Sequence, residues 1–275
     1  MVASRRGGLN STALALIPVA IAINIVVGQI VTGTPLYLDS IGTVLVGALF
    51  GPWLGLLTGI LSNVLWTFPF GNPVSIWFFY VAGVIGLLAG FAGRAGVFYR
   101  VSPRWLSAIV VGIFACALTL FVMAFLNATP SDNGPLLPNA ADLVSQQPLL
   151  FLIAFVIGAA LGYFVLERAG YAGLAGLLTG VVAAILSAPM AAYYFGGVTG
   201  SGTDLLVAAF RASGASILQS TLAQGTVSDP FDKMTSFLLV WLIIQALPRR
   251  ILLRFPVPRA FVRGERSDAP DSTRV

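Results

Sequence analysis

Long uncharged apolar segments are the feature that most limits what this chain can form. The segments 12–32, 76–93, 105–127, 148–166 and 172–194 contain no aspartate, glutamate, lysine or arginine. A helix that crosses the hydrocarbon core of a bilayer needs about 20 mainly apolar residues. Inside lipid, the backbone polar groups must be satisfied within the chain itself. We therefore predict an all-α fold, a polytopic transmembrane helical bundle.

Shorter apolar segments add to this count. Phe50, Gly51 and Pro52 interrupt one apolar stretch, which predicts a hairpin of two short helices at about 40–50 and 53–66. A last short helix is expected at 234–247. Residues 203–223 have a helical pattern laced with polar groups, which favours a partly buried or re-entrant helix. In all, we expect six to eight membrane segments.

The composition supports lipid rather than water as the main solvent. Charged residues make up 9% of the chain, against about 25% in a soluble domain. The chain has no histidine and one cysteine, Cys116, so histidine-based zinc sites, Ser-His-Asp triads and intramolecular disulfides are excluded. We expect no enzymatic activity, no cofactor, no metal and no nucleic-acid partner. The expected organisation is a single membrane domain at 1–250 and a basic, disordered cytoplasmic tail at 251–275.

The charge pattern predicts an orientation. If the N-terminus is cytoplasmic, most basic residues fall in cytoplasmic connections: Arg5, Arg6, Arg94, Arg100, Arg104, Arg168, Arg249, Arg250 and those of the tail. The opposite face then holds the acidic residues Asp39, Asp132, Asp142, Asp204, Asp229 and Asp232, with Arg211 and Lys233 as the exceptions. The positive-inside rule thus predicts a multi-pass plasma-membrane protein with both termini in the cytoplasm.

Polar and aromatic residues gather at the predicted outer face. They are Tyr37, Asp39, Asn63, Trp66, Trp77, Tyr80, Asn127 and Tyr193. Singly, Trp and Tyr at such a depth indicate an interfacial belt, and Asp39 before an apolar run is typical of a helix N-cap. As a group they make a small-molecule site plausible, because such sites combine apolar walls with a few polar anchors. Asp232 and Lys233 are interpreted as a solvated helix start, with closure of the outer pocket as the alternative.

Small residues recur at four-residue spacing. The glycine pairs are Gly55/Gly59, Gly86/Gly90, Gly158/Gly162 and Gly176/Gly180. Glycine lets helix backbones approach closely in lipid, so we expect these pairs to pack helices within the bundle. Ala20, Asn24 and Gly28 share the spacing, and this stripe could face a partner helix instead.

The stretch from Thr34 to Arg94 resembles the substrate-binding membrane subunits, or S components, of energy-coupling factor (ECF) transporters. The resemblance rests on YLDSIGTV from Tyr37, GALFGPW from Gly47 and the segment Gly55 to Asn63. The sequence DPFDK from Asp229, ahead of an apolar helix, is also similar to this group.

The resemblance implies a membrane protein of typically six spans that captures a vitamin-like small molecule at the outer face. It also implies partners: a transmembrane coupling subunit and two ABC ATPases that drive uptake. Ala20, Asn24 and Gly28 are the match to the family's coupling-subunit contacts, and Thr32 to Asp39 to the loop that covers its pocket. The absence of a Walker A motif from the chain fits a binding subunit.

Two other classes of protein remain open. A self-sufficient secondary transporter is the alternative, although ion coupling usually needs ionisable residues at mid-membrane, and none falls in the five long apolar segments. An intramembrane enzyme is disfavoured because the sequence has no histidine and no aspartyl pair of the GxGD kind.

Overall fold

The computed structural model describes residues 11–32, 34, 36–68, 70–127, 129, 138, 140–212 and 214–267. Within these residues the regular elements are helices, which confirms the all-α prediction. In chain order they are α1 (Ser11–Val31), α2 (Ile41–Phe50), α3 (Pro52–Thr67), η1 (Ser75–Phe78), α4 (Phe79–Arg94), α5 (Arg104–Leu126), α6 (Ala140–Gln146), α7 (Pro148–Phe164), α8 (Gly170–Tyr193), α9 (Asp204–Ala212), α10 (Ile217–Ala246), α11 (Arg249–Leu252) and α12 (Pro256–Ser267).

Three helical segments of the described chain are long and apolar enough to cross a membrane: Ser75–Arg94, Arg104–Ala124 and Gly170–Tyr193. The pair α6 and α7, bent by 91°, makes a fourth if it counts as one span. Length and composition thus support three or four spans, fewer than the six to eight expected. The difference arises because α2 has only 10 residues, and because α10 carries three charged side chains near its centre.

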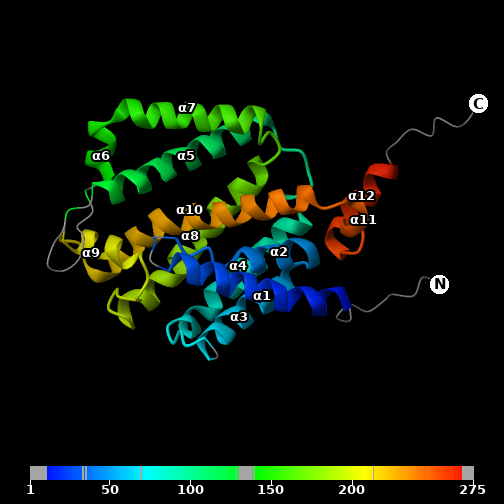
Figure 1. The fold of residues 1–275 in the computed structure, drawn as a ribbon, viewed down its shortest axis with the longest axis horizontal. Coiled ribbons are helices and arrows are strands. Elements are labelled where there is room, and N and C mark those ends of the chain that lie inside the picture. Colours follow the sequence, from blue (N-terminus) through cyan, green and yellow to red (C-terminus); the bar gives the residue numbers. More distant parts are fainter. Residues whose placement is uncertain are drawn as a thin grey trace, which may run out of the picture.

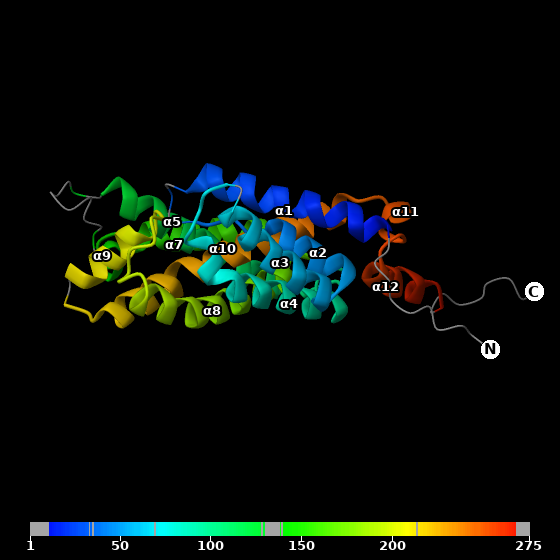
Figure 2. The same cartoon turned by 90° about the horizontal axis from the view of Figure 1, so that it is seen from below.

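The helices form two groups on either side of a central pair, α8 and α10 (Figures 1 and 2). Helices α1 to α4 pack together on one side, and α5 with α7 forms a hairpin on the other. The first turns of α1 lie at the same end of the bundle as α11 and α12, whereas α6 and α9 lie at the opposite end. Helices from the first and the second half of the chain therefore lie side by side in the bundle.

The α2–α3 hairpin is confirmed, and its break is local. Gly51 adopts a φ of 100°, which favours glycine, and Pro52 occupies the first turn of α3, where its missing N–H costs nothing. Phe50, the last residue before the break, contacts Phe255 edge-to-face. The first half of the hairpin is buried, since every residue of α2 is shielded from the surroundings, whereas α3 exposes Trp53.

Close backbone contacts confirm that the glycine pairs pack helices within the chain. A Cβ placed on Gly59 would lie 2.1 Å from the carbonyl oxygen of Ala82, which brings α3 against α4. A Cβ on Gly162 would lie 2.3 Å from that of Ser107, and one on Gly180 would lie 2.3 Å from the Cα of Pro230. These distances join α7 to α5 and α8 to α10. Side chains larger than hydrogen have no room at these crossings.

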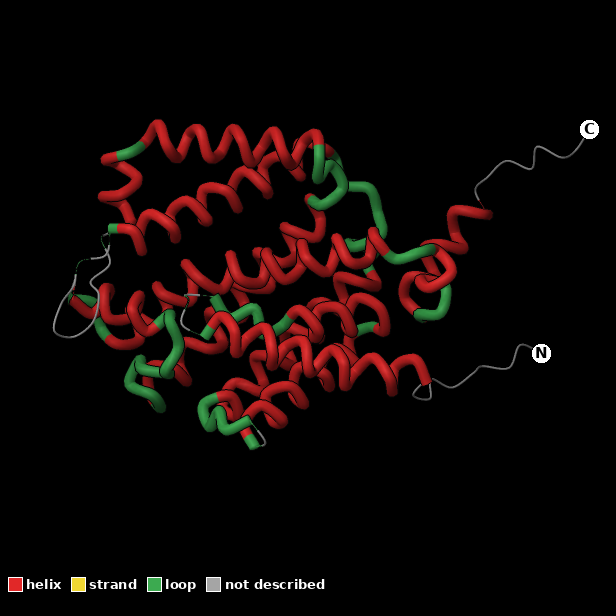
Figure 3. The backbone as a smooth tube through the Cα atoms, in the orientation of Figure 1, coloured by secondary structure: helices red, strands yellow, loops and turns green. Residues whose placement is uncertain are grey.

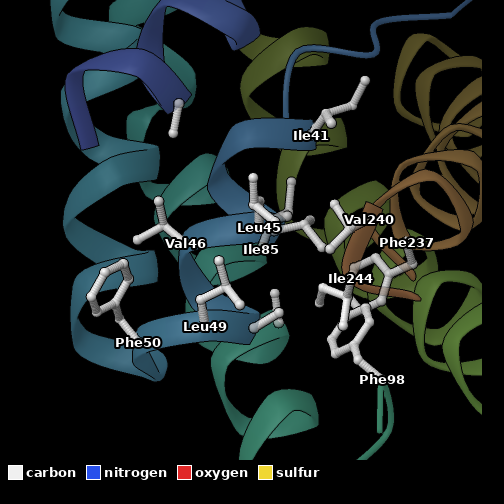
Figure 4. Close-up of a cluster of buried hydrophobic side chains, with 14 of the residues drawn as sticks. Ile41, Leu45, Val46, Leu49, Phe50, Ile85, Phe98, Phe237, Val240 and Ile244 are labelled. Atoms are coloured by element: carbon white, nitrogen blue, oxygen red, sulfur yellow. The ribbon is translucent and has the colours of Figure 1, made fainter. Parts of the chain in front are cut away.

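An apolar core joins the N-terminal helices to α10 (Figure 4). Val44 from α2, Phe98 from the α4–α5 connection and Phe237 from α10 are all fully buried. The rings of Phe98 and Phe237 stack with centroids 5.6 Å apart. This core fixes the position of α10 relative to α2, which matters because α10 supplies the charged groups of the candidate site.

The predictions for 203–223 and 234–247 are wrong in their boundaries. A single 30-residue helix, α10, begins at Ile217 and passes through Pro230 to Ala246. Ser216 and Gln219 form a capping box that defines its start. Pro230 removes one backbone donor but does not end the helix. Asp232 and Lys233 are therefore not a solvated helix start: they are buried halfway along α10.

The tail prediction also needs correction. Residues 256–267 form α12 rather than an irregular segment, and the ring of Phe261 stacks on Tyr99 with centroids 5.2 Å apart. The apolar contacts of Phe255 and Phe261 hold the segment against the bundle. Residues 268–275 lie outside the described chain.

Candidate ligand-binding site

A cavity of about 180 Å³ lies between the N-terminal helices and the α8–α10 pair. The helices α1, α3, α4, α8 and α10 contribute its wall, together with the α1–α2 and α8–α9 connections. Figure 3 shows that such connections gather at the two ends of the bundle. Packed helices thus form the sides of the cavity, and the α1–α2 and α8–α9 connections cover it.

The wall of the cavity combines apolar and polar side chains. Its apolar side chains include Trp66, Phe78, Val81 and Ile85, from α3, η1 and α4. Its polar side chains are Thr32, Tyr37, Asp39, Ser40, Asn63, Asn72, Ser75, Ser187, Thr199, Ser201, Asp204, Gln224, Asp229 and Lys233. A few convergent polar groups in an apolar concavity are the usual composition of a small-molecule site.

Four of the eight predicted binding residues line this cavity: Tyr37, Asp39, Asn63 and Trp66. Asn63 also donates from its amide to the backbone oxygen of Ser75, at 3.0 Å, which ties α3 to the start of η1. These four residues come from one stretch of sequence, 37–66, and the hairpin brings them together.

The other four predicted residues lie outside the cavity. The rings of Trp77 and Tyr194 contact each other at a tilt, with centroids 4.1 Å apart, and Tyr80 donates to the backbone oxygen of Leu186 at 2.9 Å. Tyr193 is 75% exposed, and Asn127 bonds to the backbone oxygen of Met123 in its own helix. In this structure they serve as interhelix or peripheral contacts rather than as cavity wall.

The stripe of Ala20, Asn24 and Gly28 faces inward. Ala20 and Asn24 are fully buried, and Gly28 is buried beside the ring of Trp66, at the cavity wall. This placement corrects the expectation that the stripe contacts a coupling subunit, because α2 and α3 of the same chain cover it. The outward face of α1 carries other residues, such as Val26, which is 56% exposed.

Asn24 organises a buried polar network that holds α1, α2 and α3 together. Its amide donates to the hydroxyls of Thr43, at 2.8 Å, and Ser62, at 2.9 Å. Its side-chain oxygen accepts from the backbone N–H of Gly42 at 2.7 Å. Each polar group of this side chain therefore has a partner, as burial in an apolar bundle requires.

We expect Asn24→Leu to lower the free energy of unfolding by about 1–2 kcal/mol, because the N–H of Gly42 would be left without an acceptor. Thermal unfolding of the purified protein in detergent measures this loss. Gln29→Leu, on the exposed face of the same helix, is the control and should change little. Equal stability of the two variants would contradict a stabilising role for the network.

A cluster of charges surrounds Lys233 at the centre of α10. Its ammonium lies 2.5 Å from a carboxylate oxygen of Asp232, 3.3 Å from one of Asp39 and 3.1 Å from the hydroxyl of Ser40. Lys233 and Asp232 are 4% and 0% exposed, whereas Asp39 is 30% exposed. Buried charges persist only when they are paired and hydrogen-bonded, and this cluster satisfies that requirement for Lys233 and Asp232.

The same cluster anchors the α1–α2 connection. The remaining carboxylate oxygen of Asp232 accepts from the backbone N–H groups of Tyr37 and Leu38, at 3.1 and 2.7 Å. Leu38 adopts a φ of 46°, a conformation that a leucine rarely holds without such support. Asp232 therefore links the middle of α10 to the loop 195 residues earlier in the chain.

The two loops over the cavity are bonded to each other. The hydroxyls of Tyr37 and Thr203 share a hydrogen bond of 2.7 Å, and the N–H of Gly202 donates to the backbone oxygen of Thr32. Burial raises the pKa of the Tyr37 phenol far above its ordinary value, so this group remains a neutral hydrogen-bonding partner. The cavity is thus bounded on this side by a hydrogen-bonded pair of loops.

Sequence reasoning gave the residues of α10 only an alternative role, closure of the pocket by Asp232 and Lys233, and missed the α8–α9 loop. Lys233, Asp229 and Gln224 line the cavity from α10, and Asp204 lines it from the start of α9. One signal was available in the sequence. Asp229, Asp232 and Lys233 directly precede the strongly apolar end of α10, and ionisable residues beside or within apolar segments commonly mark a functional site because their burial is costly. The interpretation of Asp232 and Lys233 as a solvated helix start concealed that signal.

The fold and the cavity define a class: an all-helical protein with helices of membrane-spanning length around a cavity lined partly by polar side chains. Within the described residues, no group of three or more histidine, cysteine, aspartate or glutamate side chains is placed to hold a metal ion. Comparison of the chain with models of protein families, with curated proteins and with solved structures found no match.

Proposed function

We propose that this protein is the substrate-binding subunit, or S component, of an ECF-type transporter, and that the cavity holds a vitamin-like small molecule. The observation that carries the proposal is the cavity itself, a concave site with apolar walls and convergent polar groups beneath two bonded loops. The resemblance of 34–94 supports it, since Tyr37, Asp39 and Asn63 of that stretch line the cavity. Uptake would be driven by a transmembrane coupling subunit and two ABC ATPases.

We further propose six membrane crossings: α1, α4, α5, α7, α8 and α10. Six crossings put both termini on one side, which agrees with the position of α1's first turns and α12 at one end of the bundle (Figure 1). That end holds basic residues such as Arg104, which pairs with Glu167 at 2.6 Å, and the arginines of α11. The positive-inside rule makes it cytoplasmic, in the plasma membrane, and the cavity loops extracytoplasmic.

A secondary transporter is the second candidate, and one observation favours it. Asp229, Asp232 and Lys233 are buried halfway along α10, a 30-residue helix about 45 Å long. The sequence had placed no charge inside a long apolar segment, which argued against ion coupling. With α10 continuous, buried ionisable groups of the kind found in ion-coupled transporters lie inside the bundle.

The experiment that separates these candidates is purification of the tagged protein from its native host in mild detergent, with crosslinking and mass spectrometry. Co-purification of ABC ATPases and a second membrane protein supports the binding-subunit proposal, and a retained small molecule identifies the substrate. Isolation of the chain alone, together with uptake of that molecule by liposomes containing only this chain, would replace the proposal with the secondary transporter.

Asp39→Ala is expected to weaken binding of the retained small molecule about ten-fold or more, with the protein still folded. The side chain lines the cavity and is 30% exposed, so its loss removes a charged contact while Lys233 keeps its bond to Asp232. Isothermal titration of the purified variants measures the change. Asp142→Ala, on the exposed surface of α6, is the control. Unchanged affinity of Asp39→Ala would remove this residue from the site.

A further inference from the structure

The wall of the cavity carries more acidic than basic side chains. Its wall includes the carboxylates of Asp39, Asp204 and Asp229, and Lys233 is the one basic side chain among the residues that line it. Asp232, directly behind the wall, adds a fourth carboxylate to the same cluster. What this imbalance implies depends on which of these groups already have partners.

The hydrogen-bonding capacity of Lys233 is fully used. An ammonium group has three donors, and those of Lys233 are directed at Asp39, Ser40 and Asp232. Its charge is also shared between two carboxylates. The one ammonium in the cavity wall is therefore not available to bind a carboxylate or phosphate of a ligand without breaking the cluster.

Two carboxylates retain unused acceptor capacity. Asp204 is occupied by the N–H groups of Thr199 and Gly200, and by the Thr199 hydroxyl. Asp39, by contrast, accepts from Lys233 through one oxygen among the described residues. Asp229 is 5% exposed, and its one bond within the described part of the chain comes from the hydroxyl of Ser228, at 3.3 Å. A buried carboxylate with so few donors is costly, and a cation or a strong donor in the cavity would relieve that cost.

The cavity wall also includes a large aromatic side chain. Trp66 lines the cavity and is 7% exposed. The neighbouring apolar wall, from Phe78, Val81 and Ile85, suits a ring. Carboxylates with unused acceptor capacity beside an apolar concavity describe a ligand with a ring body and a cationic or hydrogen-bond-donating group.

We propose that the cavity is selective for a planar organic cation, a protonated amine or amidine attached to an aromatic ring, whose charge lies between Asp39 and Asp229. The proposal rests on the binding site of the proposed function and names the chemical class of its substrate. The ring contacts Trp66 and the apolar wall, and Lys233 is a positioning residue that holds Asp39 in place. Anionic analogues are rejected because no free cation is present among the cavity-lining residues.

Three probes of nearly equal shape test the charge preference: benzamidinium, benzamide and benzoate. Titration of the purified full-length protein in lipid nanodiscs should give an affinity for benzamidinium at least about ten-fold higher than for benzamide, with no binding of benzoate. Because the assay needs no partner subunit, it separates the two proposals. Failure to find ABC partners leaves the charge preference intact, and loss of the charge preference leaves partner binding intact.

The variants Asp39→Asn and Asp229→Asn assign the preference to its residues. Each should reduce the ratio of benzamidinium to benzamide affinity about ten-fold, a change in ratio that a purely structural defect would not produce. Asp142→Asn is the control on α6 and should leave the ratio unchanged. Thermal unfolding verifies that each variant is folded, and the single Asp39→Asn variant suffices if Asp229→Asn does not fold. Binding of benzoate as tight as that of benzamidinium, no binding of benzamidinium, or an unchanged ratio in folded Asp39→Asn overturns the proposal.

Discussion

Replacing Lys233 with methionine is expected to lower the free energy of unfolding by about 3–5 kcal/mol, the largest stability loss that we predict. Methionine keeps much of the side-chain volume but removes the ammonium that pairs with Asp39 and Asp232. Asp232 is fully buried, so its charge would be left without compensation. In thermal unfolding, a loss of this size corresponds to a fall in the midpoint temperature of about 6–20 °C.

Two further variants test the electrostatic origin of that loss. Adding Asp232→Asn to Lys233→Met removes the uncompensated charge and keeps an oxygen for the N–H groups of Tyr37 and Leu38. The double variant should therefore recover a substantial part of the lost stability. Arg211→Met removes an exposed basic residue of α9 and should change little. A double variant less stable than Lys233→Met would contradict the explanation.

Adding a single methyl group at Gly86 is expected to cost about 3 kcal/mol, because the helix backbones of α3 and α4 are in contact there. A Cβ on Gly86 would lie 2.1 Å from the carbonyl oxygen of Gly55 and 2.3 Å from its carbonyl carbon. Neither atom belongs to a side chain that can rotate away. Gly86→Ala should therefore push the two helices apart and lower the unfolding temperature in detergent and in bilayers.

Gly83→Ala provides a matched control one turn earlier in the same helix. Its Cβ would meet the flexible ends of Ile60 and Leu56, at 3.1 and 3.3 Å, which can shift. Alanine is also a better helix former than glycine, by about 1 kcal/mol, so this variant should be neutral or slightly stabilising. Equal loss in both variants would indicate a general requirement for glycine in α4 rather than a backbone contact at Gly86.

The sequence predicted only part of the lining of the candidate site. Tyr37, Asp39, Asn63 and Trp66 were predicted correctly as neighbours because they lie close in sequence, at the ends of helices whose boundaries the apolar pattern and Pro52 define. Trp77, Tyr80, Asn127 and Tyr193 were placed at the same depth, but depth does not determine which side of a helix a residue occupies. That depends on helix rotation, which packing sets.

Helix α10 shows why the remaining site residues were missed. Asp229, Pro230, Asp232 and Lys233 together have the composition of a solvated turn, which led to the wrong boundary. Locally, proline and three charges disfavour a buried helix. They are tolerated because Asp39, Ser40 and the backbone of Tyr37 and Leu38 provide partners nearly 200 residues away in sequence. Tertiary pairing overrode local preference.

By itself, the sequence determined the class of fold and the contacts that depend on backbone shape. Uncharged apolar segments of about 20 residues favour helices, which satisfy their own backbone polar groups in an apolar environment, and glycine at four-residue spacing permits close helix crossings whatever the partner. The tertiary structure alone decided that α10 is continuous, that Ala20 and Asn24 face inward, and that Lys233 is paired. These features depend on which distant groups meet inside the bundle, because a buried charge is stable only where its partners lie.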